Sequence, residues 1–484
     1  AAPTITIDTI GTDQIEASSS AVANIESGSS GVFFTCAEGE DCGSVTGLEI
    51  WQQTLTATAG DLSPNTLYGL QVKARNGDGV ETAYSDSESV YTLAQVPTIG
   101  VNTLGSTSII LEAGNLSNVT DGSSGVYFDC TSENCDEGIS DWVQASTDTV
   151  TGLTSNTLYT FRVKARNGDG TETDYTGEAS LYTAANTPGE PTVTQLSTSS
   201  LNVVIDDSAN NAAVTFALLE LGTGQYVNKT TGALQVSEDW GTYAQWGESD
   251  GVDVTGLESG TLYTFLVKAR NSDAAETAFS GTVGEYTALN APTIGSPTAL
   301  SGESIRWAFT DNEANEQGFR VYNLTDTPLV TCATPDLTYC DESELTPNTE
   351  YTRKVAAYNG GGTSAFSATA TARTLAAVPS ISGAVATNST VDLTISMGSN
   401  PADTELVIQD EASGLYVDPS DGELVGSPVW ATLSTIETNI GSQATNLAPN
   451  TQYSFRVMAR NADAVETAFS DSLSLYTLAN EPDA

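Results

Sequence analysis

Residues 62–97 read LSPNTLYGLQVKARNGDGVETAYSDSESVYTLAQVP, and versions of this stretch come back four more times along the 484-residue chain. Self-similarity at a regular spacing identifies an array of similar units before any secondary structure is assigned. The chain is therefore predicted to hold five domains, here called the first to fifth repeats: 1–96, 97–188, 189–291, 292–378 and 379–484. One tyrosine marks each copy: Tyr68, Tyr159, Tyr263, Tyr351 and Tyr453.

Apolar and polar residues alternate after this tyrosine. Tyr68, Leu70 and Val72 fall on one face while the residues between them fall on the other, which is the period of two of a half-buried β-strand. Residues 76–79, Asn-Gly-Asp-Gly, tolerate positive φ, so the chain is expected to reverse there into a second strand at 80–85. The stretch thus predicts a β-hairpin in each repeat.

The residues before the tyrosine carry a second signature. Leu-x-Pro-Asn-Thr-x-Tyr, at 62–68, 345–351 and 447–453, is similar to the tyrosine corner of Greek-key sandwiches, in which the hydroxyl bonds back to the upstream backbone. With the Phe-x-Val-x-Ala-x-Asn pattern that follows, a Thr-Leu ending and a proline that opens the next unit, essentially the whole chain resembles tandem fibronectin type III domains of secreted and surface proteins of bacteria. The resemblance implies an all-β fold, a linear array of five Greek-key β-sandwiches.

Acidic residues dominate the charge. The chain has 62 Asp and Glu against 15 Lys and Arg, a formal net charge of -47, which makes nucleic acid or an anionic membrane an unfavourable partner. There is also no run of 18 or more apolar residues that would span a membrane. The simplest interpretation is a solvated, self-repelling surface, and the alternative is that the acids recruit cations such as Ca²⁺ between domains.

The few cations are concentrated, since eleven of the 15 lie on the strand after the tyrosine. Arg353 is among them and falls where the alternation predicts a core residue, for which the sequence offers no explanation. In four repeats an arginine precedes the hairpin asparagine and a glutamate follows it, which predicts cross-hairpin ion pairs worth about 0.2–1 kcal/mol each where exposed. These pairs are Arg75 with Glu81, Arg166 with Glu172, Arg270 with Glu276, and Arg460 with Glu466.

Six cysteines occur as three close pairs. The chain has no histidine and no repeat carries four thiols, so metal binding is the weaker alternative to disulfides. Disulfides indicate an oxidising, extracellular setting, and the start at Ala1 without Met predicts a mature secreted product. The predicted pairs are Cys36 with Cys42, Cys130 with Cys135, and Cys332 with Cys340.

Chemistry for catalysis is sparse. Without histidine there is no Ser-His or Cys-His nucleophile and no imidazole base, and the repeats leave no segment for a catalytic domain built on two carboxylates. The sequence therefore predicts a protein that is not an enzyme and needs no cofactor. Ca²⁺ stays open at acidic turns that lack the EF-hand spacing: Asp206, Asp207, Asp418 and Asp421.

Tryptophans follow the repeat. Trp51, Trp142 and Trp246 all lie at the same spacing before the tyrosine of their repeat, and one large aromatic residue per sandwich is typical of a core. Trp240 stands outside this pattern. Together with Tyr226 and Tyr416, Trp240 is a candidate contact for a sugar ligand.

These observations favour a non-catalytic structural protein outside the cell, a subunit of a surface fibre, filament or surface layer. Self-association would use end-to-end contacts that resemble the internal junctions, or strand addition at an open sheet edge. Two alternatives stay open: an adhesin or carbohydrate-binding stalk that contacts surface glycans, and the spacer region of a larger secreted enzyme.

Overall fold

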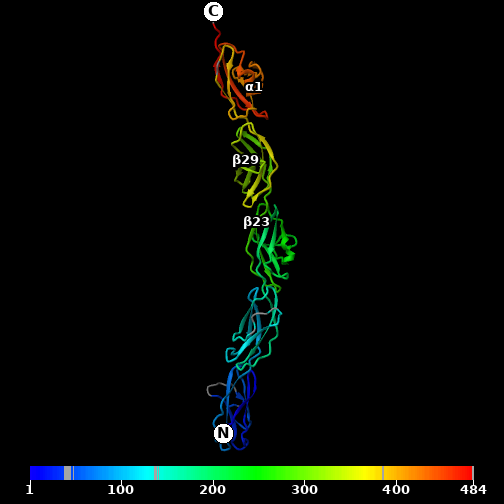
Figure 1. Ribbon diagram of the computed structural model, residues 1–484, viewed down its shortest axis with the longest axis vertical. Coiled ribbons are helices and arrows are strands. Elements are labelled where there is room, and N and C mark those ends of the chain that lie inside the picture. The colour runs from blue at the N-terminus through cyan, green and yellow to red at the C-terminus, as the bar shows by residue number, and fades with distance from the viewer. Residues whose placement is uncertain are drawn as a thin grey trace. The chain divides into compact units, whose positions relative to one another are not determined.

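Antiparallel β-strands make up nearly all of the regular structure. The computed structural model describes residues 1–37, 45, 46, 48–133, 135, 139, 141–383 and 386–481. Besides strands, this part of the chain contains the α-helix α1 (Leu433–Ile440) and the 3₁₀ helices η1 (Tyr243–Trp246) and η2 (Glu248–Asp250) (Figure 1). The predicted all-β class is confirmed.

The chain divides into two compact units, and each is described by itself. Unit 1 comprises residues 1–192, 203–252 and 265–283, and unit 2 comprises 193–202, 253–264 and 284–484. The division passes through the third repeat, so the boundaries of the five predicted domains stay a prediction.

The first repeat forms two sheets around one core. Its strands are β1 (Ile5–Ile10), β2 (Ile15–Ser19), β3 (Gly31–Cys36), β4 (Val45–Thr46), β5 (Trp51–Gln52), β6 (Thr56–Ala59), β7 (Leu67–Arg75) and β8 (Glu88–Tyr91). The sheets have the orders β1-β2-β6-β4 and β5-β3-β7-β8. On β7 the alternation holds, because Tyr68, Leu70 and Val72 are buried together with Ile15 and Phe34.

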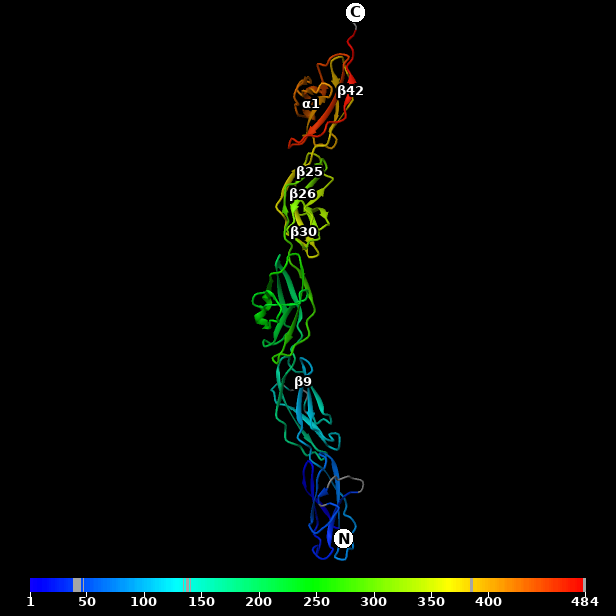
Figure 2. The same ribbon diagram turned by 180° about the vertical axis from the view of Figure 1, so that it is seen from behind.

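The second repeat has the same plan. It contains β9 (Thr98–Thr103, labelled in Figure 2), β10 (Ser108–Gly114), β11 (Gly125–Cys130), β12 (Thr147–Thr151), β13 (Leu158–Arg166) and β14 (Ala179–Tyr182). The sheets have the orders β12-β10-β9 and β11-β13-β14. Ile109 and Leu111 of one sheet and Phe128 and Phe161 of the other are buried in one cluster.

The third repeat adds a hairpin and short helices to this plan. Its elements besides η1 and η2 are β15 (Gly189–Ser197), β16 (Ser200–Asp206), β17 (Thr215–Glu220), β18 (Gln225–Val227), β19 (Leu234–Gln235), β20 (Gly241–Thr242), β21 (Val252–Thr255), β22 (Leu262–Arg270) and β23 (Val283–Tyr286). Within unit 1, β17 pairs with β18 and β22 along its edges, β20 pairs with the start of β17, and β19 pairs with β18.

The fourth repeat has aromatic side chains in its core. Its strands are β24 (Thr293–Ile294), β25 (Thr298–Ser301), β26 (Ser304–Thr310), β27 (Gly318–Tyr322), β28 (Pro328–Cys332), β29 (Tyr339–Glu342), β30 (Glu350–Asn359), β31 (Gly362–Thr363) and β32 (Ala370–Arg373), several of them labelled in Figure 2. β26 pairs with β24, β25 and β29, while the other sheet has the order β28-β27-β30-β31, with β32 also on β30. Trp307, Phe309 and Phe319 are buried between them.

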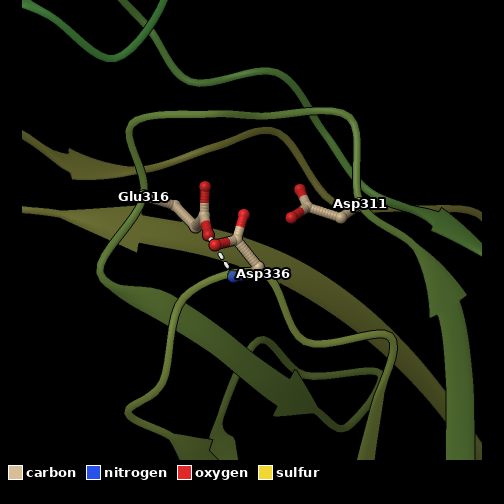
Figure 3. Close-up of side chains that lie close together, drawn as sticks. All are labelled: Asp311, Glu316 and Asp336. Carbon is tan, nitrogen blue, oxygen red and sulfur yellow. Dashed lines mark hydrogen bonds between the residues drawn. The ribbon is translucent and has the colours of Figure 1, made fainter.

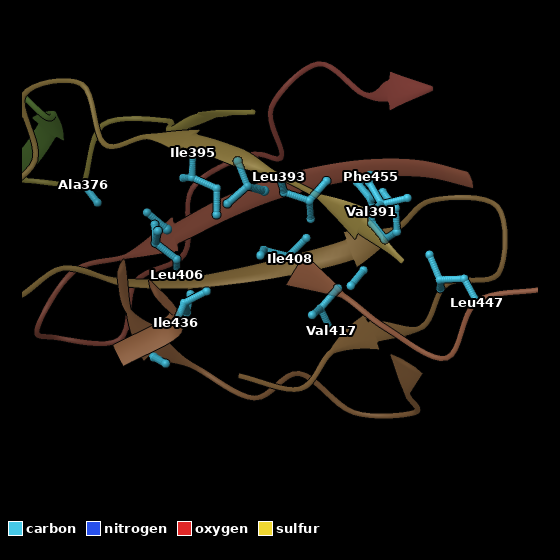
Figure 4. Close-up of a cluster of buried hydrophobic side chains, with 14 residues drawn as sticks. Ala376, Val391, Leu393, Ile395, Leu406, Ile408, Val417, Ile436, Leu447 and Phe455 are labelled. Carbon is cyan, nitrogen blue, oxygen red and sulfur yellow. The ribbon is translucent and has the colours of Figure 1, made fainter. Parts of the chain in front are cut away.

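The fifth repeat closes its core with the helix. Its strands are β33 (Ser380–Ser382), β34 (Val391–Asp392), β35 (Thr394–Ser396), β36 (Glu405–Asp410), β37 (Tyr416–Val417), β38 (Leu424–Val425), β39 (Ala431–Thr432), β40 (Gln443–Ala444), β41 (Gln452–Arg460) and β42 (Leu473–Tyr476). Figure 4 shows Val391, Leu406, Ile408 and Phe455 pointing into one cluster with Ile436 of α1.

The tyrosine corner is present in all five repeats. The hydroxyl oxygen of Tyr68 accepts the backbone N–H of Ser63 at 2.9 Å, and the other four tyrosines accept the N–H of the residue five positions upstream. This bond ties the start of the long strand to the loop before it, so the predicted role of the tyrosine is confirmed.

The second hairpin strand predicted at 80–85 does not form. After the turn at 76–79, Glu81 forms a single bridge to Arg75, and the next strand, β8, begins only at Glu88. The hydroxyl oxygens of Thr82 and Ser85 accept the N–H groups of β7 at 3.1 Å. These side chains take hydrogen bonds that a regular ladder would use, so the segment follows β7 without becoming a strand.

Candidate functional site

The glutamates after the hairpin turn pair with a lysine, and not with the predicted arginine. Glu81 lies 2.7 Å from Lys73 and Glu172 lies 2.5 Å from Lys164, while Arg75 and Glu81 pair through their backbones alone. The lysine stands two residues before the arginine on the same face of the strand. Its ammonium group contacts the second hairpin arm, while the arginine lies over a tryptophan ring. The same correction holds for Arg166 with Glu172 and for Arg270 with Glu276, where Lys268 contacts the glutamate at 2.6 Å.

In the fifth repeat the lysine position is Met458. Arg460 instead contacts Glu405 of the neighbouring strand at 2.6 Å. Arg460 and Glu466 are joined by a backbone bridge. The predicted ion pair of Arg460 with Glu466 is therefore also wrong, because Glu405 is the partner of Arg460.

The arginines of this strand lie over tryptophan rings. The guanidinium carbon lies 4.3–4.6 Å from the ring centroid in four repeats, and such cation–π contacts contribute about 0.5–1 kcal/mol at exposed sites. We call these strands with their aromatic neighbours the cation–aromatic face. The pairs are Arg75 with Trp51, Arg166 with Trp142, Arg270 with Trp240, and Arg460 with Trp430. This contact explains why the scarce cations gather on one strand.

Lys268 is the most enclosed cation of this face. Its ammonium group lies 2.6 Å from both Glu238 and Glu276 and 5.2 Å from the centroid of Trp240. Burial alone would lower the pKa of Lys268, but the hydrogen bonds to the two glutamates raise it, and the net direction is upward. The hydrogen bond from Lys268 in turn lowers the pKa of Glu238, so the cluster stays charged.

The burial of the tryptophans does not follow their spacing in the sequence. Trp246 at the end of η1 is 1% exposed and Trp307 is fully buried. Trp51 and Trp142 are only partly buried and lie on the cation–aromatic face. Their counterpart in the third repeat is therefore Trp240 and not Trp246, so the core role inferred for Trp51 and Trp142 was wrong.

The three candidate sugar contacts lie in two repeats, Tyr226 and Trp240 in the third and Tyr416 in the fifth. Tyr226 donates its hydroxyl hydrogen to Glu238 at 3.0 Å, and Trp240 donates its indole N–H to the same carboxylate at 3.0 Å. Tyr416 lies on β37 of the fifth repeat. The structure thus joins Tyr226 and Trp240 through Glu238 and leaves Tyr416 apart from them, and sugar binding stays a prediction.

Two predicted cysteine pairs are disulfides in the structure, Cys130 with Cys135 and Cys332 with Cys340. Cys42 lies outside the described residues, so the pair Cys36–Cys42 does too. Each described disulfide closes a loop within one repeat.

The four acidic candidates for calcium act as turn formers. Asp206, Asp207 and Asp421 each accept a backbone N–H two residues ahead. The hydroxyl and backbone N–H of Ser420 lower the pKa of Asp418. No candidate metal cluster among the described residues includes any of these four.

One acidic cluster escaped the sequence analysis. Asp311, Glu316 and Asp336 of the fourth repeat place a carboxylate oxygen each within 4.8 Å of one another (Figure 3). Asp336 follows Glu316 at a distance in the sequence and lies on a different loop, so only the tertiary structure joins them.

Asparagine side chains tie consecutive repeats together. Asn65, from the tyrosine corner of the first repeat, is 1% exposed. It donates to the carbonyl oxygens of Ser117 (2.8 Å) and Asn118 (2.9 Å) and accepts the N–H of Gly168 at 2.9 Å, all in the second repeat. The same arrangement recurs with Asn156 contacting Asn211 and Ser272, and with Asn348 contacting Thr404 and Ala462.

A second asparagine, in the hairpin of the following repeat, donates a hydrogen bond back to the preceding repeat. Asn167 donates to the carbonyl oxygen of Thr92 at 3.2 Å, and the neighbouring Asp169 accepts the N–H of Tyr91 at 2.9 Å. Gly168 allows a close approach, because a Cβ there would lie 2.5 Å from the Tyr91 ring. Asn271 and Asn461 repeat the contact to Thr183 and Thr374.

The junction between the third and fourth repeats departs from this pattern. Gly260 occupies the corner position, and Asn359 of the fourth repeat donates to its carbonyl oxygen at 2.8 Å. Glu313 accepts the hydroxyl hydrogen of Ser259 at 2.8 Å and the N–H of Asn290 at 2.6 Å. A carboxylate from the next repeat thus replaces the missing asparagine side chain.

We expect Asn65→Ala to loosen the first junction by about 1–3 kcal/mol, because it strands the buried N–H of Gly168 and two carbonyl groups. Amide hydrogen exchange of peptides covering 117–122 and 167–170 would measure this, since it reports local opening free energies. Asn450→Ala is the matched control: it changes the same motif position in the fifth repeat, where the side chain is exposed. Equal protection in Asn65→Ala and the parent chain would show that the junction does not depend on this side chain.

Comparison with known proteins gives distant similarities. No family model matches the chain. Receptor-type tyrosine-protein phosphatase eta of Gallus gallus is 27% identical over 319 residues, which cover 63% of this chain and 20% of the relative. The chain thus spans about a fifth of that relative.

Two solved structures of fibronectin type III domains align with parts of this chain. A two-domain fibronectin type III segment of chicken tenascin aligns with 39% of this chain and 100% of its own, at 18% identity and a TM-score of 0.27. The FN1–FN3 domains of chicken CNTN1 align with 58% of this chain and 99% of their own, at 19% identity and a TM-score of 0.23. The bacterial setting stays a prediction.

The fold and the junctions define a class: an all-β chain of tandem antiparallel repeats, coupled by side-chain hydrogen bonds to backbone groups. Two of its repeats carry described disulfides. Among the described residues, no helix has the length and apolar character needed to cross a membrane.

Proposed function

We propose that the chain is a non-catalytic, extracellular structural protein with fibronectin type III-like repeats, and that copies associate end to end through the same contacts that join its repeats. The observation behind this proposal is that both halves of a junction are present and exposed. The asparagine-rich corner is exposed on the fifth repeat, and the hairpin is exposed on the first.

The corner half comprises Asn450 and Tyr476. Asn450 is exposed, whereas its counterparts Asn65 and Asn156 are 1% and 3% exposed. Tyr476 is 60% exposed, although its counterpart Tyr91 lies against Gly168. The fifth repeat therefore carries an exposed copy of the surface that the first repeat presents to the second.

The hairpin half comprises residues 76–78. Asn76 is exposed, whereas Asn167, Asn271 and Asn461 are at most 4% exposed. A Cβ on Gly77 would meet only one atom within 4 Å, the carbonyl oxygen of Ser27. In the proposed contact Tyr476 packs on Gly77 of another copy, Asp78 accepts the N–H of Tyr476, and Asn76 donates to the carbonyl of Thr477.

Sedimentation of the full chain at increasing concentration tests this proposal. The weight-average mass is expected to rise between about micromolar and about millimolar protein, because a contact between separate copies lacks the effective concentration on the order of millimolar that the linker gives each internal junction. Gly77→Val is expected to abolish the rise, since the added side chain occupies the position of the tyrosine ring.

Gly177→Val is the matched control, because a Cβ there meets nothing within 4 Å. A Gly77→Val chain keeps its fifth repeat intact, so mixing it with parent chain is expected to shorten the assemblies by capping one end. A parent chain that stays monomeric throughout, or a Gly77→Val chain that assembles like the parent, would overturn the proposal.

A second candidate is a spacer within a larger extracellular protein. It is supported by the relative whose matched region is 20% of its length. The intact mass of the natural secreted protein separates the two: a mass well above that of the 484-residue chain favours the spacer. The adhesin alternative predicts glycan binding that Trp240→Ala removes.

A further inference from the structure

Three carboxylates converge at one end of the fourth repeat. Asp311 and Glu316 belong to the loop between β26 and β27, and Asp336 belongs to the loop between β28 and β29. Figure 3 shows the three side chains turned toward one another from these two loops. No ion pair joins any of them to a lysine or arginine of the described chain.

Glu316 has a buried carboxylate, and one of its two oxygens accepts no hydrogen bond. The residue is 6% exposed. Its Oε1 accepts the N–H of Asp336 at 2.8 Å, whereas its Oε2 is buried and has no hydrogen-bond donor. A buried anionic oxygen without a partner is costly, and here it lies beside two further carboxylates.

The surrounding charges act on Asp311 as well. Burial raises the pKa of Asp311, the N–H of Glu313 opposes this, and the negative charges of Glu316, Asp336 and Glu313 raise the pKa further. Three acids held together without a cation repel one another, so the arrangement gains from a positive ion between them.

We propose that Asp311, Glu316 and Asp336 form a binding site for Ca²⁺. Calcium takes hard oxygen ligands at about 2.3–2.6 Å in a flexible geometry, so two of its ligand oxygens lie up to roughly 5 Å apart. The mutual separation of these carboxylate oxygens, within 4.8 Å, fits that span. Mg²⁺ binds at about 2.0–2.1 Å and demands a tighter octahedron.

The site would join two loops that are already anchored. The disulfide Cys332–Cys340 spans the loop of Asp336. Between Asp311 and Glu316, Glu313 accepts from Ser259 at 2.8 Å, and Asn315 donates to the carbonyl of Ser259 at 2.9 Å. Bound Ca²⁺ would therefore also order the loop that contacts the third repeat, independently of any association between copies.

Calorimetry of the full chain with Ca²⁺ or with a chelator tests the site. The thermal transition of the fourth repeat is expected to rise by several degrees in about 10 mM CaCl₂, given dissociation constants on the order of 10⁻⁴ to 10⁻³ M in extracellular calcium modules. Hydrogen exchange of residues 311–317 is expected to slow at the same time. Equal MgCl₂ controls for screening of the large negative charge.

Glu316→Gln is expected to lose the calcium response while its calcium-free transition stays at or above that of the parent, because a buried charge is removed. Asp421→Asn removes a carboxylate from a turn of the fifth repeat and is expected to respond like the parent. The proposal is overturned if CaCl₂ and chelator give the same transition, if MgCl₂ reproduces the shift, or if Glu316→Gln responds like the parent.

Discussion

Replacing Arg353 by methionine is expected to destabilise the fourth repeat by about 3–5 kcal/mol, because it leaves Glu342 as a buried charge without its partner. The Arg353 guanidinium contacts both carboxylate oxygens of Glu342, at 2.8–3.1 Å. Both side chains are nearly enclosed, with exposed fractions of 12% and 6%. Trp307 donates its indole N–H to the same carboxylate at 2.8 Å.

The pair links the two sheets of this repeat. Arg353 lies on β30 of one sheet, whereas Glu342 on β29 and Trp307 on β26 belong to the other. A long cationic side chain at a core position therefore reaches across the sandwich to an acid that also holds the central tryptophan. This is the physical reason for the arginine that interrupts the apolar alternation.

Hydrogen exchange of peptides from β26 and β30 would measure the loss, because their amides report the opening free energy of the core. The double variant Glu342→Gln with Arg353→Met is the control. It removes both charges while the glutamine amide oxygen can still accept from Trp307, so it is expected to lie within about 1–2 kcal/mol of the parent. A single Arg353→Met variant as stable as the double variant would contradict the assigned role.

Trp246→Ala is expected to destabilise the third repeat by about 3–5 kcal/mol, the usual cost of removing a buried tryptophan. Trp246 is 1% exposed, and its indole N–H donates to the buried carbonyl of Phe216 at 3.0 Å. Trp240→Ala is expected to cost only about 1 kcal/mol, since it loses contacts with Lys268 and Arg270 on a partly exposed face.

These two variants form a matched pair, because both replace a tryptophan by alanine in the same repeat. Hydrogen exchange of peptides from β17 would compare them. Equal losses would contradict the division into a core residue and a surface residue. A glycan array probed with Trp240→Ala would at the same time test the sugar-binding alternative.

Local sequence determined much of this protein. The alternation after each tyrosine and the corner motif before it specify a half-buried strand and its anchor, because both depend on contacts within a few residues. The Asn-Gly-Asp-Gly turn at 76–79 reverses the chain for the same reason, and close cysteines such as Cys130 and Cys135 can meet whatever the rest of the fold does. Five repeats of one pattern followed directly.

Tertiary structure decided what needs a partner far along the chain. Spacing could not tell that Trp246 is buried while Trp51 is stacked under an arginine. The third repeat inserts the short helices η1 and η2 after β20, and this insertion brings Trp246 to the spacing that Trp51 has in the first repeat. Nor could it tell that Lys73 reaches Glu81, because reach across a hairpin depends on side-chain length and direction.

The asparagines show the difference most clearly. In sequence Asn65 and Asn167 belong to a turn motif, and only the packing of successive repeats makes them buried hydrogen-bond partners. The cluster of Asp311, Glu316 and Asp336 is similar, since two separate loops of the fourth repeat bring these charges together. Local propensity specifies the strands and turns, whereas burial and charge pairing between distant loops arise only when the sheets pack.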